Sequence, residues 1–190
     1  ALSKALGKPV VVHIKADPYF APATLGALHR DGRLVAIKYA VVRDDPGRDA
    51  YLDAILQEVP RGMVVSGIGE RPAIVHLRDF GLVSFTTGSG CIAPRLSMTL
   101  LDLLKRKRYD EAEAVRAAFL PLEDARDDIS PIRVLHDAVM LAGVADTLAG
   151  LIEALELAPA HVGGLSWGGV VALELYRRRP ELVGSLILCD

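Results

Sequence analysis

The chain has 190 residues, of which 51% are hydrophobic and 24% charged, and its formal net charge is -2. These values predict a globular chain long enough for one domain and give no indication of a nucleic-acid partner. No run approaches the roughly 20 apolar residues of a membrane span, no leader pattern is present, and the cysteines lack metal-ligand spacing, so we expect a cytoplasmic protein without membrane, metal or cofactor.

Short apolar runs alternate with helical stretches in the first 108 residues, which is the pattern of parallel β/α units. We expect strands over 10–14, 34–39, 63–66 and 82–86, and helices over 23–29, 51–59, 72–80 and 94–107. The fold class predicted for this part is therefore α/β, with four β/α units in a row.

The remaining chain has a different organisation. Two consecutive helices are expected over 109–127 and 131–142 without a strand between them. The alternation then resumes with a helix over 147–157, a strand over 161–165, a helix over 169–179 and a strand over 183–189. We expect about six parallel strands in one partly open sheet, or pairing with another chain, because exposed sheet edges attract further strands.

Lys38 closes the apolar run Leu34-Val35-Ala36-Ile37-Lys38 and is the first candidate catalytic residue. Reactive groups of parallel β/α folds collect at the carboxyl ends of the strands, where this amine is expected. Apolar surroundings disfavour the charged form of an amine and so supply the neutral nucleophile that forms a Schiff base. The alternative is a lysine that extends from a strand end to solvent.

Several segments in order along residues 9–147 carry a family resemblance. They are Val35-Ala36-Ile37-Lys38, Ser66-Gly67, Gly81-Leu82-Val83-Ser84, Ala93-Pro94, Leu120-Pro121-Leu122, Pro131-Ile132-Arg133 and Ala142-Gly143. This stretch resembles the carboxyl-terminal half of class I aldolases of the dihydrodipicolinate synthase and N-acetylneuraminate lyase family. The resemblance implies a half (β/α)8 barrel over 1–108 and a helical extension over 109–147. It also implies an imine between Lys38 and a 2-oxo acid such as pyruvate, with Gly67, Ser84 and Gly88 around the substrate.

Two departures from the family pattern bear on activity. The family has a tyrosine proton shuttle on the strand before the lysine, and His13 is at the matching position here. A histidine can relay protons near neutral pH, or it can serve as a structural hydrogen-bonding group within the barrel. The family's first four strands and their threonine-rich carboxylate-binding motif have no counterpart in this sequence.

Ser166 is the second candidate nucleophile, in Gly164-Leu165-Ser166-Trp167-Gly168. Small residues on both sides of a serine are typical of the tight strand-to-helix turn of a nucleophile elbow. The segment 148–190 resembles the helix, strand, elbow, helix and strand of α/β-hydrolases. The alternative is a small-residue turn that only lets strand and helix pack closely, because no histidine follows Ser166 and Asp190 is the only later aspartate.

Three functional hypotheses follow. The first is a Schiff-base lyase acting on a small 2-oxo acid, inactive as it stands if the missing barrel half is required. The second is a non-catalytic chimeric or truncated domain, and the third is a serine hydrolase that uses Ser166. For the first hypothesis we expect a homo-oligomer or a complementing barrel half as the protein partner.

Overall fold

The computed structural model describes residues 2–165 and 167–189. Ser166 lies outside the described residues. Contacts divide the chain into two compact units, and we treat each by itself: the first comprises Ala1–Thr87 and Arg95–Pro121, and the second comprises Gly88–Pro94 and Leu122–Asp190. The domain boundaries at 108 and 147 remain a prediction.

The first unit is built on a parallel sheet in the order β1-β2-β3. Its strands are β1 (Val10–Ile14), β2 (Leu34–Tyr39) and β3 (Val64–Ser66). Its helices are α1 (Leu2–Leu6), α2 (Pro22–Arg30), α3 (Ala50–Glu58), α4 (Ala73–Arg78), α5 (Pro94–Lys105) and α6 (Tyr109–Ala117), with a short 3-10 turn at Arg61–Met63. The expected strands over 10–14 and 34–39 are confirmed at both ends.

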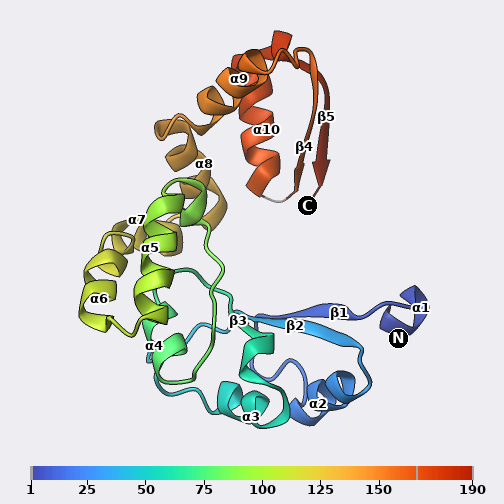
Figure 1. The fold of residues 1–190 in the computed structure, drawn as a ribbon, viewed down its shortest axis with the longest axis vertical. Helices are drawn as coiled ribbons and strands as arrows, with labels where there is room; N and C mark the ends of the chain where they lie inside the picture. The colour runs from blue at the N-terminus through green and yellow to red at the C-terminus, as the bar shows by residue number, and fades with distance from the viewer. Residues whose placement is uncertain (1, 166, 190) are drawn as a thin grey trace. The chain divides into compact units, whose positions relative to one another are not determined.

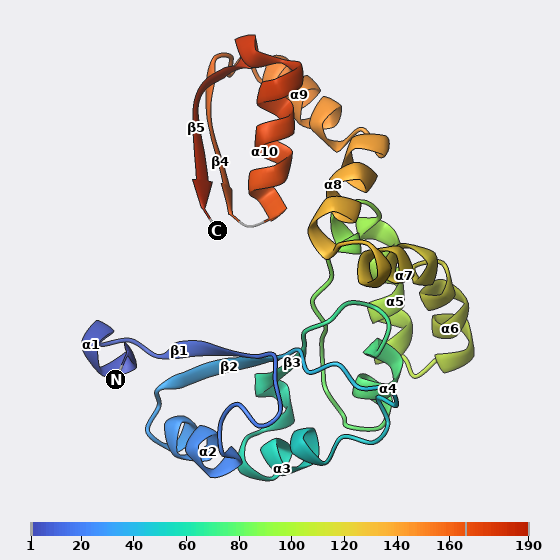
Figure 2. The same ribbon diagram turned by 180° about the vertical axis from the view of Figure 1, so that it is seen from behind.

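Helices α2 and α3 lie on the same face of the β1–β2 pair, as Figure 1 and the reverse view in Figure 2 both show. Apolar side chains that point to these helices form the core of the unit. The fully buried members include Ile14, Leu25, Ile37, Leu52, Ile55 and Val64. Because strand side chains alternate, the residues next to Ile14 and Ile37 in the sequence point to the opposite face of the sheet.

Local sequence explains where α2 and α3 begin and end. Pro22 occupies the first position of α2, where its missing N–H leaves no hydrogen bond unmade, and Gly32 at φ +65° turns the chain after the helix. Asp49 caps α3 by accepting a hydrogen bond from the Leu52 N–H at 3.0 Å. Pro60 follows the carboxyl end of α3, as expected from the sequence.

The strand expected over 82–86 is wrong. This segment forms an isolated parallel bridge between Phe85 and Ser66 instead of a strand. The Ser66 N–H donates to the Ser84 carbonyl at 3.1 Å, and the Thr86 N–H donates to the Ser66 carbonyl at 2.8 Å. Because β3 ends at Ser66, the segment 82–86 pairs with it at one residue only.

The single helix expected over 109–127 is also wrong. Two helices, α6 and α7 (Leu120–Asp128), occupy this stretch. Pro121 has no N–H to donate to the Ala117 carbonyl, so an unbroken helix cannot pass through this point. The buried Phe119 marks the break between the two helices.

The second unit contains a parallel pair of strands, β4 (Ala160–Leu165) and β5 (Val183–Cys189). It also contains most of α7, α8 (Pro131–Leu141), α9 (Val144–Ala154), α10 (Trp167–Arg178) and short 3-10 turns at Ser89–Cys91 and Pro180–Leu182. Ala149, Ile152, Leu175 and Leu182 form its buried cluster. The expected single sheet of about six strands is therefore wrong, because the described strands form one sheet of three and one of two.

In the described part of the chain no single helix is long and apolar enough to cross a membrane. By length and composition alone, the bent pair Pro131–Leu141 and Val144–Ala154 passes that test together, with a bend of 54° between the two helices.

Candidate active site

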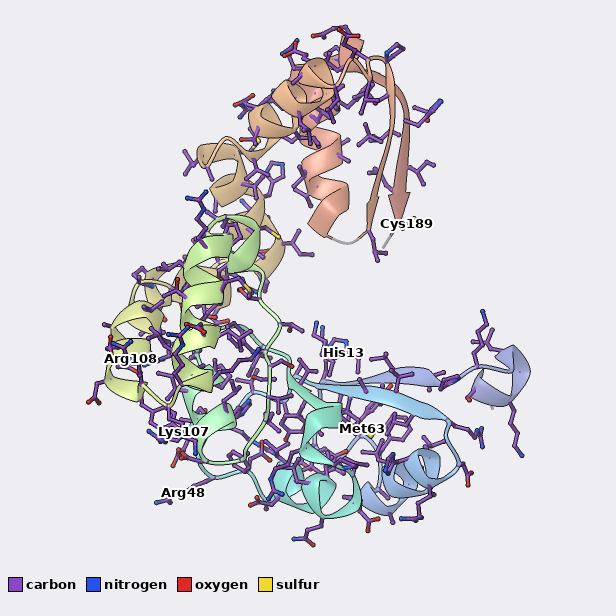
Figure 3. All side chains as sticks on the ribbon, in the orientation of Figure 1. His13, Arg48, Met63, Lys107, Arg108 and Cys189 are labelled. Atoms are coloured by element: carbon purple, nitrogen blue, oxygen red, sulfur yellow. The ribbon has the colours of Figure 1, made fainter. Side chains whose placement is uncertain are left out.

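Lys38 and His13 are direct neighbours on adjacent parallel strands. Residue 13 of β1 is paired in register with residue 38 of β2. Ile14 and Tyr39, the next residues on each strand, are fully buried against the helices, so the alternation directs His13 and Lys38 to the other face. Figure 3 shows His13 on the side of the sheet away from α2 and α3. His13 is exposed and Lys38 half-buried.

Gly67 is packed directly against the lysine strand. Its N–H donates to the Tyr39 carbonyl at 2.6 Å. A Cβ at position 67 would lie 2.9 Å from Lys38 Cγ and 2.7 Å from the Tyr39 carbonyl oxygen. Because real Cβ atoms do not approach other atoms so closely, the side chain of Lys38 has room only if residue 67 is glycine.

Ser84 and Gly88, the other two predicted substrate-binding residues, belong to different compact units. Ser84 is half-buried, and its carbonyl joins the backbone to β3 through the Ser66 N–H. Gly88 belongs to the second unit, where a Cβ at this position would meet the Leu135 side chain at 2.8 Å. The substrate roles of Ser84 and Gly88 therefore stay predictions.

The charge environment of His13 involves a residue that the sequence analysis did not single out. His13 is exposed as a whole, but partial loss of solvent around its ring lowers its pKa, and the positive charges of Lys38 and Lys15 lower it further. His13 is therefore mainly neutral at pH 7 and able to accept a proton. The alternation of polar and apolar residues in His13-Ile14-Lys15 is the signal in the sequence that could have revealed Lys15.

A network of charged groups joins the loops that follow β1 and β2. The Arg43 guanidinium donates to Asp17 at 2.5 Å and to Asp49 at 2.9 Å. Asp49 also accepts a hydrogen bond from the Tyr39 hydroxyl at 2.6 Å. Burial alone would raise the pKa of Asp49, but the hydrogen bonds from Arg43, Tyr39 and the Leu52 N–H outweigh it and hold that pKa below its ordinary value.

A buried polar pair joins β3 and α4. His76 Nδ1 is 2.8 Å from Ser66 Oγ, and both side chains are almost completely buried. The His76 ring also contacts the Tyr39 ring edge-on, with 6.3 Å between ring centroids. Burial lowers the pKa of His76 to about 4, although the charge of Asp49 acts in the opposite direction. His76 is therefore neutral at pH 7 and contributes to the core.

The residues before and after Ser166 pack closely against each other: Gly164 lies against Gly168 and Gly169. β4 ends at Leu165 and α10 begins at Trp167, so a strand precedes the predicted elbow and a helix follows it. A Cβ at position 164 would overlap the backbone of Gly168 and Gly169. Strand and helix can approach so closely only because residue 164 has no side chain.

His161 contacts a side chain of the neighbouring strand. Its Nδ1 is 2.7 Å from Ser185 Oγ on the neighbouring strand β5. His161 and Ser185 are paired in register and both are exposed. The pair therefore lies on the outer face of the β4–β5 sheet.

Comparison with solved structures shows the fold of most of the chain. A dihydrodipicolinate synthase from Oceanobacillus iheyensis is 24% identical with a TM-score of 0.63, over 74% of this chain and 47% of that chain. A second one from Bacillus clausii is 22% identical with a TM-score of 0.59, over 71% of this chain and 44% of that chain. The protein thus has a mixed α/β fold with parallel strands that is similar to dihydrodipicolinate synthases.

Sequence comparisons give shorter matches. No known protein-family profile matches the chain. A protein from Mycobacterium tuberculosis described as a non-heme bromoperoxidase is 56% identical over 45 residues, which is 24% of this chain and 17% of that protein. A mycothiol acetyltransferase from Thermomonospora curvata is 38% identical over 71 residues, which is 36% of this chain and 23% of that protein. The chain thus spans about half the length of the synthases and less than a quarter of these two proteins.

Proposed function

We propose that the chain carries the lysine half of a Schiff-base-forming lyase of class I aldolase type, acting on a 2-oxo acid such as pyruvate. The observation that carries this proposal is the pairing of Lys38 with His13 on the face of the sheet that α2 and α3 leave open. The likeness to dihydrodipicolinate synthases supports the proposal at the level of fold.

The chemistry assigns one role to each residue of the pair. Once its Nζ has given up a proton, Lys38 attacks the carbonyl carbon of the oxo acid and forms a carbinolamine, which loses water to give the imine. His13, with its lowered pKa, accepts and returns the protons that these steps move. Gly67 keeps the space beside Lys38 Cγ free, so the amine can approach the substrate.

We also propose that the first 108 residues form half of a (β/α)8 barrel, completed by a second copy or by a complementing half. β1 pairs only with β2 among the described residues, so the other edge of β1 has free backbone groups. The match to about half of each synthase supports this proposal.

The test is reductive trapping. We expect that incubation with pyruvate and borohydride, followed by peptide mass spectrometry, finds the reduced adduct on Lys38. Lys38→Met should abolish this adduct, whereas Lys8→Met, which removes an exposed lysine before β1, should retain it. Absence of the adduct, or equal labelling of all surface lysines, would favour the non-catalytic alternative.

A second candidate function is hydrolysis at Ser166. The close packing of Gly164 against Gly168 and Gly169 supports a sharp turn at this point, and the short match to the non-heme bromoperoxidase bears on the same alternative. A fluorophosphonate probe should label Ser166 if the serine is activated, and Ser166→Ala should remove the label. If the probe labels a known serine hydrolase but not this chain, Ser166 is not an activated nucleophile and serves only as part of a turn.

A further inference from the structure

Lys15 is the first residue after β1 and follows His13 by two positions. Ile14 between them is fully buried, and both His13 and Lys15 are exposed. The Ala40 N–H donates to the Ile14 carbonyl at 2.7 Å, so β1 and β2 are still hydrogen-bonded at the residue before Lys15. Adjacent strands are about 4.8 Å apart and two residues of strand span about 7 Å, so the long side chains of Lys15 and Lys38 can reach a common point.

The segment that carries Lys15 is tied to the lysine strand. Arg43, in the loop after β2, binds Asp17 in the loop after β1 at 2.5 Å. The same guanidinium binds Asp49, which in turn accepts the hydrogen bond of the Tyr39 hydroxyl. Tyr39 is the residue after Lys38, so this chain of contacts fixes the Lys15 segment relative to the end of β2.

We propose that Lys15 binds the carboxylate of the 2-oxo acid whose carbonyl Lys38 attacks, and is thus a specificity-determining residue of the site. This inference rests on the proposed function. In a 2-oxo acid the carboxylate is bonded directly to the attacked carbonyl carbon, so a cation close to the nucleophile can bind it. Lys15 provides that cation and takes no part in the covalent step, in which Lys38 Nζ bonds to carbon and the carbonyl oxygen leaves as water.

An ammonium group is a strong partner for a carboxylate and requires no preformed loop.

The experiment compares pyruvate with its methyl ester, which has the same ketone but no charge. For Lys15→Met we expect the rate of borohydride-trapped labelling at Lys38 to fall about fivefold with pyruvate, the upper end of what an exposed charge pair contributes. The rate with methyl pyruvate should stay within about twofold. Lys15→Arg should retain the preference for pyruvate, and Lys8→Met should change neither rate.

The outcomes distinguish this inference from the proposed function. If wild-type chain gives no adduct on Lys38 with either compound, both the proposed function and the carboxylate role are wrong. If wild type is labelled and Lys15→Met reduces both rates equally, or neither, only the role of Lys15 is overturned. Lys15 is exposed and makes no core contact, so the variant should fold, which its circular dichroism spectrum and unfolding midpoint check.

Discussion

The pKa of His13 depends on the charges of two nearby lysines. Burial is the largest influence that lowers its pKa, followed by the charges of Lys38 and Lys15. Removal of a nearby positive charge makes it easier to protonate the imidazole, so Lys38→Met and Lys15→Met should each raise the pKa of His13. Because the effect of burial remains, that pKa should stay below the value of 6.5 for a free imidazole in both variants.

The measurement is an NMR titration of the His13 ring resonances. Lys8→Met is the matched control, because it removes an exposed lysine that lies before β1, five residues from His13 in the sequence. An unchanged titration in both test variants would mean that the three groups do not converge, and would remove the basis for a shared site.

His76 makes the first unit sensitive to acid. Its pKa is about 4 in the folded chain and about 6.5 in the unfolded chain. Because the folded-state value is the lower one, the stabilisation is complete above pH 6.5 and is lost as the pH falls toward 4. The shift corresponds to about 3 kcal/mol of unfolding free energy over that interval.

Denaturant unfolding at pH 7 and pH 4 tests this expectation. Between pH 7 and pH 4, wild type should lose about 3 kcal/mol more unfolding free energy than His76→Gln, whose amide does not titrate. His29→Gln removes an imidazole that is only half-buried, and it should keep the wild-type drop. Asp49 adds a second loss at lower pH: its pKa is depressed in the folded chain, so its contribution disappears only when the pH falls below about 4.

At the level of elements, the approach of β3 to β2 depends on one glycine. Gly67→Ala would place a Cβ 2.7 Å from the Tyr39 carbonyl oxygen and 2.9 Å from Lys38 Cγ. We expect a loss of roughly 1–3 kcal/mol of unfolding free energy, typical of overpacking. The displaced lysine should also be trapped more slowly with pyruvate.

Gly62→Ala is the matched control for that variant. Nothing lies within 4 Å of a Cβ at this position. Its unfolding free energy should therefore stay within about 1 kcal/mol of wild type. Equal losses in the two variants would show that the effect comes from losing a glycine and not from contact with β2.

The elements also show what sequence patterns can predict. The strands over 10–14, 34–39 and 183–189 were predicted to the residue, because apolar runs bounded by turn residues define them locally. The segment 82–86 is also largely apolar but forms only a bridge, since a strand also needs a partner of sufficient length. The break before Pro121 could have been predicted from the proline alone.

The candidate site, too, could be predicted from the sequence only in part. The family resemblance placed His13 on the strand before Lys38, but their pairing in register could not be derived from the sequence. The contacts of Arg43 with Asp17 and Asp49 join residues whose spacing has no periodicity, so no pattern predicts them. Lys15 was overlooked because a solvent-exposed lysine after a strand is common on protein surfaces.

At the scale of the whole molecule, each compact unit has its own sheet and its own buried cluster. The buried cluster of the first unit lies between β1–β3 and their helices, and that of the second includes Ile152 and Leu175. A change that disrupts only the second cluster should therefore leave the first sheet intact.

Gly164→Ala tests this independence. A Cβ at position 164 would overlap the backbone of Gly168 and Gly169, so α10 must move away from β4. We expect faster hydrogen exchange in peptides from β4, β5 and α10, and unchanged exchange in β1–β3, measured by mass spectrometry. The neighbouring Gly163→Ala is the control, because its Cβ would meet only Ile187 Cβ, at 4.0 Å. If Gly164→Ala also accelerates exchange in β1–β3, the two units unfold cooperatively. A packing change at residue 164 would then also destabilise the sheet that carries Lys38.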